Sequence, residues 1–223
     1  INTSSATADI TDNDAVTADL GVTTDGNETG PVDIVYTVTL NNTNNTGSAI
    51  TFDIDDLGTG TATSSDDYNA FGAADQITVA DGESNGTYTV TVINDTDFEA
   101  DIETLITGIS NSSNGDVTIN TASATADITD NDAVTADLSV SQHGLEEGEQ
   151  SIVYTVTLSS ANNTGSAITF DMDDLGTGTA TSGDDYNAFG AADQITVADG
   201  ASTGTYTVTV INDTDFEADI ETL

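Results

Sequence analysis

The sequence predicts an all-β fold of tandem, seven-stranded antiparallel β-sandwich modules. Val, Ile, Thr and Tyr alternate in runs of six to eight residues, the period of strands that bury one face. Clusters of Asn, Asp and Gly separate these runs at the spacing of a two-sheet sandwich. No segment sustains a helical period, so the pattern favours sheets alone.

The sequence also repeats with a period of 118 residues. Residues 1–105 align without gaps to residues 119–223 and differ at 17 of these 105 positions. Such self-similarity predicts an array of modules rather than one globule. The predicted domains are 1–14, the closing strand of a preceding repeat; 15–132, a complete repeat; and 133–223, a second repeat that lacks its last strand. The joint ATADITDNDAVTADL at 124–138, also present at 6–20, contains no Gly, Pro or Ser, so we expect it to be stiff.

The complete repeat contains its expected strands in a simple order. The clearest is 34–40, where Ile34, Tyr36, Val38 and Leu40 alternate with Val and Thr. Gly-containing turns such as 81–86 separate the runs. The expected strands are 16–22, 34–40, 50–54, 77–79, 88–92, 105–109 and a long closing strand at 117–128, with a weak edge strand or loop at 58–65.

The charge balance excludes several classes of partner. The chain has 40 Asp and Glu, one His and neither Lys nor Arg. Nucleic acids and anionic membranes are therefore excluded, because both require cationic side chains. No apolar run approaches the about 20 residues of a membrane span. Repulsion among so many carboxylates destabilises a compact fold unless cations offset it.

An acidic segment contains the strongest metal-binding pattern. Residues 93–105 read INDTDFEADIETL and recur as 211–223, with a carboxylate at every second position from Asp95 to Glu103. A regular strand would stack these five carboxylates on one face about 7 Å apart, which is unfavourable. A loop around Ca²⁺, which takes about six to eight oxygen ligands, avoids this arrangement. The alternative is a solvated acidic face.

Comparison of the two copies separates candidate ligands from other carboxylates. Asp25 is replaced by His143, Asp33 by Ser151 and Glu83 by Ala201, so these three are poor candidates. The carboxylates kept in both copies are Asp66, Asp67, Asp95, Asp97, Glu99, Asp101 and Glu103, repeated as Asp184, Asp185, Asp213, Asp215, Glu217, Asp219 and Glu221.

Together these motifs resemble the Calx-beta domain. They are a Glu after the first strand, an Asp-Tyr pair, a D-x-x-x-E-x-x-x-E loop and a closing strand that ends in I-x-DND. The resemblance covers the whole repeat and implies an immunoglobulin-like sandwich with Ca²⁺ at one end. This family occurs in sodium–calcium exchangers, integrin β4 and large bacterial surface proteins.

The resemblance also implies a set of Ca²⁺ ligands. In the first copy they are Glu28, Asp67, Asp95, Asp97, Glu99, Asp130 and Asp132; in the second they are Glu146, Asp185, Asp213, Asp215 and Glu217; Asp12 and Asp14 would serve a preceding module. Asn94 stands where the family often has Asp, which would weaken one ion. Glu147 beside Glu146 makes the first ligand of the second copy ambiguous.

The residues of this chain give little support for a catalytic site. His143 is the only His, and its counterpart is Asp25, so a repeated catalytic site cannot use it. Zinc sites and Ser/His/Asp catalysis need partners that the chain lacks. We predict no catalytic residues and no enzymatic activity.

The sequence is best interpreted as a calcium-stabilised structural repeat. The expected role is a stalk, extender or filament of a large extracellular or cell-surface protein, such as an adhesin. The alternatives are an adhesive module that binds a glycan or protein, and a calcium-sensing regulatory domain. The expected partners are neighbouring repeats of the same chain, and strand exchange or lateral assembly with other subunits stays open.

Overall fold

The chain folds into two compact units made of β-strands. The computed structural model describes residues 5–214 and 220–223. In this part every regular element is a strand, and no helix could cross a membrane. One unit comprises Ile1–Asp95 and Ile102–Thr129, and the other comprises Thr96–Asp101 and Asp130–Leu223. The predicted all-β class is confirmed.

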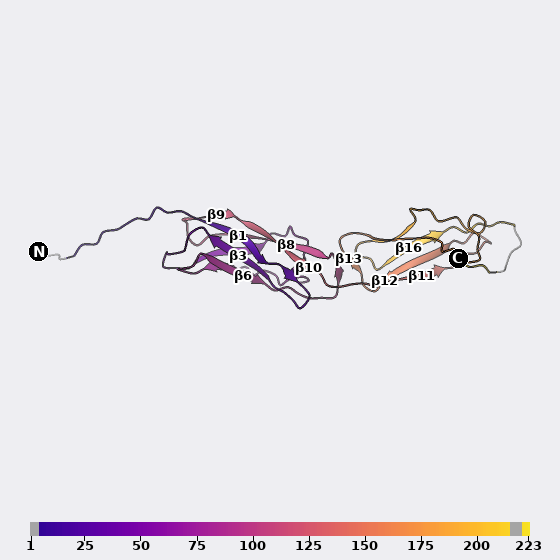
Figure 1. The fold of residues 1–223 in the computed structure, drawn as a ribbon, viewed down its shortest axis with the longest axis horizontal. Coiled ribbons are helices and arrows are strands. Elements are labelled where there is room, and N and C mark those ends of the chain that lie inside the picture. The colour runs from indigo at the N-terminus through magenta and orange to yellow at the C-terminus, as the bar shows by residue number, and fades with distance from the viewer. Residues whose placement is uncertain (1–4, 215–219) are drawn as a thin grey trace. The chain divides into compact units, whose positions relative to one another are not determined.

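The first unit contains two sheets (Figure 1). One sheet has the strand order β6-β3-β1-β9 and the other has the order β2-β10-β8-β4-β5. Their bounds are β1 Val16–Thr24, β2 Gly26–Asn27, β3 Ile34–Leu40, β4 Ile50–Asp56, β5 Gln76–Val79, β6 Asn85–Val90, β8 Ile102–Ser110, β9 Val117–Thr121 and β10 Ser123–Thr129. The 58–65 segment, expected to be a weak strand or a loop, is a loop.

Alternation places the core between these sheets. On β3, Ile34, Tyr36 and Val38 are fully buried, whereas Val35 and Thr37 are only partly covered. Phe52 of β4 and Leu105 of β8 face them from the other sheet and are equally buried. The period-2 pattern therefore predicts the buried face correctly.

The prediction of one long closing strand at 117–128 is wrong. The structure divides it into β9, which pairs in parallel with β1, and β10, which joins the other sheet and pairs antiparallel with β8. The partly buried apolar residues Val117 and Ile119 are at odd positions, whereas the buried Ala126 and Ile128 are at even ones. This change of parity requires the chain to change sheets. The sandwich accordingly contains parallel pairings, β1 with β9 and β2 with β10, beside its antiparallel ones.

The two sheets approach closely where β5 lies beside β6. A Cβ atom on Gly86 of β6 would lie 2.2 Å from the carbonyl oxygen of Thr78 on β5. Side chains larger than hydrogen do not fit there. In the second unit, Gly204 has the same relation to Thr196, at 2.3 Å.

The second unit repeats this plan over fewer strands. Its sheets have the orders β11-β12-β16 and β14-β15, and β7 pairs in parallel with β13. The bounds are β7 Phe98–Glu99, β11 Ala136–Gln142, β12 Ile152–Leu158, β13 Asn162–Asn163, β14 Ile168–Asp171, β15 Gln194–Val197 and β16 Thr203–Val208. Its buried cluster is smaller and consists of Val156, Leu158, Ile195 and Val197.

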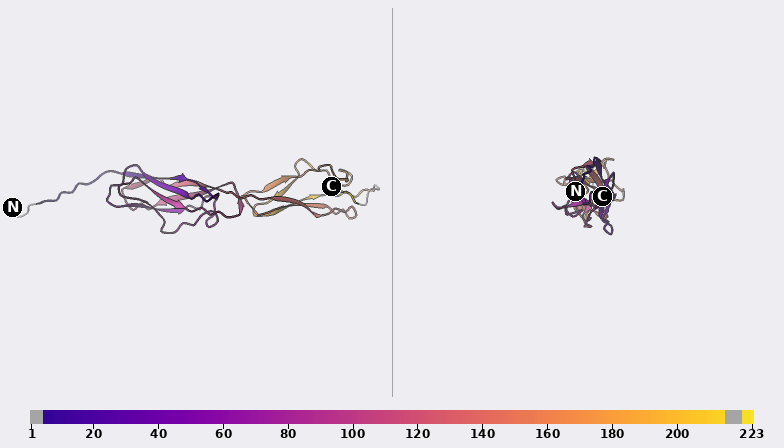
Figure 2. Two further views of the ribbon diagram at one scale, coloured as in Figure 1. Left: turned by 60° about the horizontal axis from the view of Figure 1, so that its bottom comes forward. Right: turned by 90° about the vertical axis from the view of Figure 1, so that its left-hand side faces the viewer.

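Residues 5–15 precede β1 without joining a sheet (Figure 2). They are exposed along their whole length, and Ile10 retains 98% of its accessible surface. This segment has the sequence of a strand but no strand partner in the part of the chain that the structure describes.

Candidate metal centre

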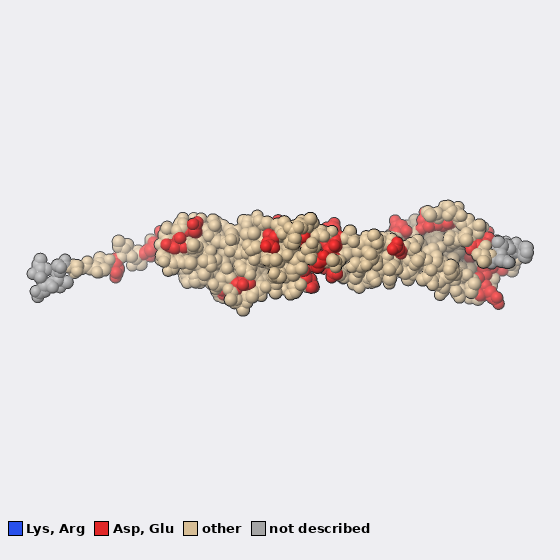
Figure 3. Space-filling model, turned by 90° about the horizontal axis from the view of Figure 1, so that it is seen from below, with Lys and Arg blue, Asp and Glu red and all other residues tan. Residues whose placement is uncertain are grey.

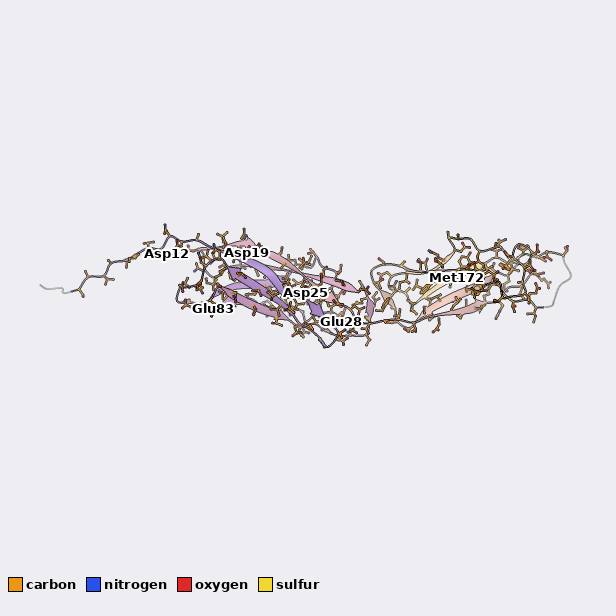
Figure 4. All side chains as sticks on the ribbon, in the orientation of Figure 1. Asp12, Asp19, Asp25, Glu28, Glu83 and Met172 are labelled. Carbon is orange, nitrogen blue, oxygen red and sulfur yellow. The ribbon has the colours of Figure 1, made fainter. Side chains whose placement is uncertain are left out.

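Glu28 is buried because β2 brings it to the end of a sheet. β2 pairs in parallel with the last residues of β10, and the Glu28 amide donates to the Thr129 carbonyl at 3.1 Å. Gly26 makes this approach possible, since a Cβ there would lie 2.8 Å from Val92 Cγ2. The Glu28 side chain is 1% exposed. Figure 4 shows Glu28 at one end of the first unit, with Glu83 at the other end.

A tight turn buries Asp67 completely. Its amide donates to the Thr63 carbonyl at 3.0 Å, and the Thr63 amide donates back to Asp67 Oδ2. The Asp67 carbonyl accepts from the Ile93 amide at 2.8 Å, which connects this turn to the start of the acidic loop. The adjacent Tyr68 is buried in the core and fixes the direction of the turn.

The acidic loop is not a regular strand. Residues 93–97 have no strand assignment, and only the two-residue β7 interrupts the loop before β8 begins at Ile102. Asp95 and Glu99 are half-buried, whereas Asp97 is exposed. The alternating carboxylates therefore do not stack along one strand face, as the charge argument predicts.

Carboxylates gather within each unit. In the first unit, Glu28, Asp67 and Asp95 each offer one oxygen, and these oxygens lie within 4.8 Å of one another; in the second unit, Asp130 and Asp132 are paired in the same way. Two negative charges at that distance repel by about 3 kcal/mol at an effective dielectric constant of about 20. Three of the seven ligands predicted for the first copy thus lie together in the first unit, and Asp97 belongs to no such group among the described residues.

Chain connectivity keeps the later members near the earlier ones. Glu99 is four residues beyond Asp95, and Asp130 immediately follows β10. The Glu99 amide donates to Asp130 Oδ2 at 3.3 Å. The Asp132 amide donates to Asp130 Oδ1 at 2.9 Å, so the DND corner forms its own local turn.

Three buried carboxylate oxygens, from both units, indicate that these acidic groups suit a cation. Asp67 Oδ1, Asp132 Oδ2 and Asp185 Oδ1 are buried and accept no hydrogen bond from the part of the chain that the structure describes. Buried carboxylate oxygens without a partner are costly unless a proton or a metal ion satisfies them. The donors are all oxygens, which is the set that hard cations such as Ca²⁺ prefer.

The second unit brings together the matching carboxylates that the structure describes. The Asp185 carbonyl accepts from Ile211 at 2.8 Å, as Asp67 does from Ile93. The pKa of the Glu221 carboxyl is raised by desolvation first and then by the negative charges of Asp185, Glu146 and Asp213. These carboxylates are therefore close enough to disfavour one another's charge. Asp215 and Glu217 lie outside the described residues.

The structure distinguishes Glu146 from its neighbour Glu147. Glu146 lines the same cavity as Asp185 and acts on Glu221, whereas Glu147 does neither. Glu146 is exposed, unlike its counterpart Glu28, because no described strand covers it as β10 covers Glu28. Glu221 was missing from the predicted ligands, although its repetition of Glu103 was a signal for it.

Asp12 and Asp14 are exposed and isolated from these groups. The Asp14 amide donates to Asp12 Oδ1 at 3.3 Å, the same local bond that Asp132 makes with Asp130. The DND sequence thus forms its turn whether or not a module end is adjacent.

Comparisons with known proteins identify one family. The Calx-beta domain model matches residues 11–132 and 129–222. The apo form of the Calx CBD1 domain aligns with 18% identity over 53% of this chain and 100% of its own, with a TM-score of 0.43. The CBD12 structure from CALX1.2 aligns with 17% identity over 86% of this chain and 74% of its own, with a TM-score of 0.41.

A third solved structure, described as the calcium binding domain CBD12 of CALX1.1, has 16% identity over 86% of this chain and 75% of its own, with a TM-score of 0.40. No curated protein is significantly similar to the chain.

Proposed function

Because the chain belongs to the Calx-beta family, we propose that its units are calcium-stabilised structural repeats of a large extracellular surface protein or adhesin. The observation that carries the calcium part is the buried Asp67 Oδ1 and its counterpart Asp185 Oδ1, which accept no hydrogen bond from the described residues. Both oxygens belong to carboxylate groups whose charges oppose folding. A doubly positive ion, when bound, supplies the missing partner and offsets the repulsion.

The residues that would hold the ion in the first unit come from three loops. Asp67 contributes from its turn, Glu28 from the end of β2, and Asp95 from the acidic loop. Since these ligands are distant in sequence, they assemble only in the folded chain, and ligand binding then stabilises the fold by mass action.

Strand order supports a mechanical role. β1 opens the first unit, and β9 leads through β10 to its end, yet β1 and β9 lie side by side and parallel from Val16 opposite Val117 to Asp19 opposite Thr121. Tension on the two ends of the unit pulls these strands past each other along their length. Their hydrogen bonds are then strained together, so the unit resists extension until several bonds break at once.

The repetition of the sequence supports a stalk or extender. Two consecutive copies keep the same residue at all but 17 of 105 positions, and the copies preserve strands such as β3 and β12 at the same offset. Repeat proteins extend by adding equivalent units. The excess of carboxylates and the lack of Lys and Arg also fit an extracellular location with millimolar calcium.

Urea unfolding with and without calcium tests the calcium part. We expect the urea midpoint of the chain to rise with added CaCl₂, to fall on chelation, and to respond less to equal MgCl₂, because Mg²⁺ dehydrates reluctantly. The midpoint would be the same in calcium and chelator if the carboxylate groups were only a solvated face.

Single-molecule stretching tests the mechanical part. We expect each unit to open at a distinct force peak, and the peak to be higher in calcium than in chelator. Smooth extension without a peak would contradict a load-resisting stalk while leaving calcium binding intact.

Recognition of a glycan or protein is a second candidate, favoured by one observation. The two repeats differ at four of the five residues from 29 to 33, and residues 29–32 are exposed. Exposed, variable turns are where binding surfaces diversify. Binding of the chain to a glycan array, lost when residues 29–33 are exchanged for residues 147–151, would support this candidate.

A further inference from the structure

The turn before β9 contains one of the two Asn-Gly dipeptides of the chain. These dipeptides are Asn85-Gly86 and Asn114-Gly115. When glycine follows asparagine, its main-chain nitrogen can approach the asparagine side chain closely, because glycine has no side chain to hinder the approach. The two dipeptides lie in different local structures, so their reactivity should differ as well.

Asn85 is held in an extended strand. It belongs to β6, which pairs with β3 along its whole length and places Gly86 opposite Val38. Gly86 is also buried against the Thr78 carbonyl of β5. The Gly86 nitrogen can turn toward the Asn85 side chain only if this pairing breaks. We therefore expect Asn85 to be unreactive in the folded chain.

Asn114 is held in a turn that folds its side chain over the following main chain. The Asp116 amide donates to Asn114 Oδ1 at 3.0 Å, which is the local bond of an Asx turn. The ring that this hydrogen bond closes contains both Asn114 Cγ and the Gly115 nitrogen. The bond also draws electrons from Cγ, and it stabilises the negative oxygen that forms when a nucleophile adds there.

The turn and the glycine coincide at Asn114. Asn27 and Asn44 make the same local turn with the amide two residues further on. The residues that follow them, Glu28 and Asn45, have side chains that crowd the attacking nitrogen. The other Asn-Gly dipeptide has the glycine but lies in a strand. Both requirements are therefore met at Asn114.

We propose that Asn114 is a site of spontaneous deamidation, which converts it to isoaspartate and releases the start of β9. The Gly115 nitrogen forms a bond to Asn114 Cγ and gives up its proton, and the Cγ–Nδ2 bond breaks with loss of ammonia. One water molecule then opens the resulting succinimide ring. Attack of water on Cγ gives aspartate, and attack on the main-chain carbonyl carbon gives isoaspartate. Water is the only other reactant.

Isoaspartate lengthens the main chain by one carbon atom where it enters β9. The Asn114 carbonyl accepts from the Val117 amide at 3.2 Å and from the Ser112 hydroxyl at 3.0 Å. In isoaspartate this carbonyl becomes part of a carboxylate outside the main chain, so the turn loses its geometry. Val117 begins β9 opposite Val16, and the pairing of β9 with β1 should therefore weaken. In the proposed stalk these strands bear the load, and only this mechanical consequence rests on the proposed function.

Incubation of the whole chain in warm, mildly alkaline calcium buffer tests the site. A protease specific for Asp and Glu then releases peptides that contain either dipeptide, since the chain has no Lys or Arg for trypsin, and mass spectrometry follows the exchange of NH₂ for OH. We expect Asn114 to react at least about tenfold faster than Asn85, a difference of about 1.4 kcal/mol in activation free energy. In concentrated urea the two rates should converge, because strand and turn are both lost. Equal rates in the folded chain, or a slower reaction of Asn114 in the folded chain than in urea, would overturn the proposal.

Gly115→Ala is the matched variant. A Cβ on Gly115 has no described atom within 4 Å, and Gly115 is not among the residues with positive φ, so the variant should fold like the parent chain, which circular dichroism checks. The added methyl group crowds the attacking nitrogen and should slow the reaction at Asn114 at least about fivefold. Deamidation of the G115A chain at the rate of the parent would also overturn the proposal.

The stability of the product tests the release of β9. Asn114→Asp, freshly purified, carries the charge of the product without the additional carbon atom. We expect the aged chain, enriched in isoaspartate, to have a lower urea midpoint in calcium than both the parent and the N114D chain. The same midpoint for the aged and N114D chains would overturn the release of β9.

Discussion

Asp67 is the side chain of the first unit on which the calcium proposal depends most. It is fully buried, one of its oxygens accepts from the Thr63 amide, and the other accepts no hydrogen bond from the described residues. Its neighbour Asp66 is exposed. Adjacent carboxylates thus differ in environment as much as two side chains can, which makes them a matched pair for mutagenesis.

Asp67→Asn should change stability in opposite directions with and without calcium. In chelator, loss of a buried charge from a repelling group should leave the chain as stable or more stable. In calcium, loss of a ligand should remove most of the gain; a tenfold weaker affinity corresponds to about 1.4 kcal/mol at saturating ion. Urea unfolding measures both, with Asp66→Asn as the control expected to change neither by more than about 0.5 kcal/mol. Equal losses in both buffers would identify Asp67 as merely structural.

The tyrosines predict how the free energy of unfolding changes at alkaline pH. Burial raises the pKa of the Tyr36 hydroxyl to about 12, and the hydroxyl donates to the Leu105 carbonyl at 3.0 Å. Burial also raises the pKa of Tyr88 to about 12, while a hydrogen bond to Asp193 does so for Tyr206. The folded chain then binds more protons than the unfolded chain above pH 10, so the free energy of unfolding falls as pH rises from about 10 to about 12.

Tyrosinate absorbance checks this expectation. The signal should stay low at pH 10 and rise together with loss of β-structure, because all six tyrosines have raised pKa values. Ionisation of several tyrosines at pH 10 in a chain that remains folded would contradict it.

At the scale of elements, the sandwich depends on close contact between β5 and β6. Gly86 allows the Thr78 carbonyl to approach, and Gly204 repeats this in the second unit. Gly21 in β1 has no neighbour within 4 Å of a Cβ. The first unit therefore contains one glycine with no room for a side chain, Gly86, and one with ample room, Gly21.

Gly86→Ala should destabilise the first unit by about 2 kcal/mol or more, because the added methyl group collides with backbone that cannot rotate away. Gly21→Ala should be neutral or slightly stabilising, since it restricts the unfolded chain without a collision. Thermal or urea unfolding distinguishes them. A mild effect at Gly86 would mean that β5 can shift away from β6.

Most strands of the first unit were predictable from the sequence, and the strand predictions that were wrong have physical causes. Strong alternation at Ile34 to Leu40 predicted β3 because one face is buried throughout. The division of 117–128 into β9 and β10 was missed, although the change of parity between Ile119 and Ala126 contained the signal. Parallel pairing of β1 with β9 was beyond local reasoning, since it depends on which strands meet after the chain has passed through both sheets.

The site was predictable as a set of residues but not as a geometry. Repetition between copies identified Asp67 and Asp95, and the resemblance to a family added Glu28 and Asp130. The sequence could not show that Asp97 is exposed while Asp95 lies close to Glu28, because alternation assigns Asp95 and Asp97 to one face.

At the scale of the whole molecule, one sign of charge dominates. Figure 3 shows acidic groups in red and no blue on the face drawn, as expected of a chain without Lys or Arg. The formal charge is −40, and no ion pair with Lys or Arg can offset it. Folding therefore depends on the ions of the medium in addition to the ions at specific sites.

In chelator, the urea midpoint should rise with NaCl, because the screening length falls from about 10 Å at 0.1 M to about 3 Å at 1 M. In calcium the rise should be smaller, since bound ions already offset part of the repulsion. Urea is the appropriate denaturant because it adds no charge. A midpoint independent of NaCl in chelator would show that long-range repulsion contributes little.

Neutral donors take the place of cations around the surface carboxylates. Asp19 accepts from Asn120 and Thr121, and Asp53 accepts from Gln76 and Asn111, which lowers the pKa of both carboxyls. Amide and hydroxyl donors carry no net charge, so electrolyte does not weaken them as it weakens attraction between opposite charges. Concentrated salt therefore removes no stabilising attraction from this surface. Removal of salt, rather than its addition, is the change of medium that should unfold the chain.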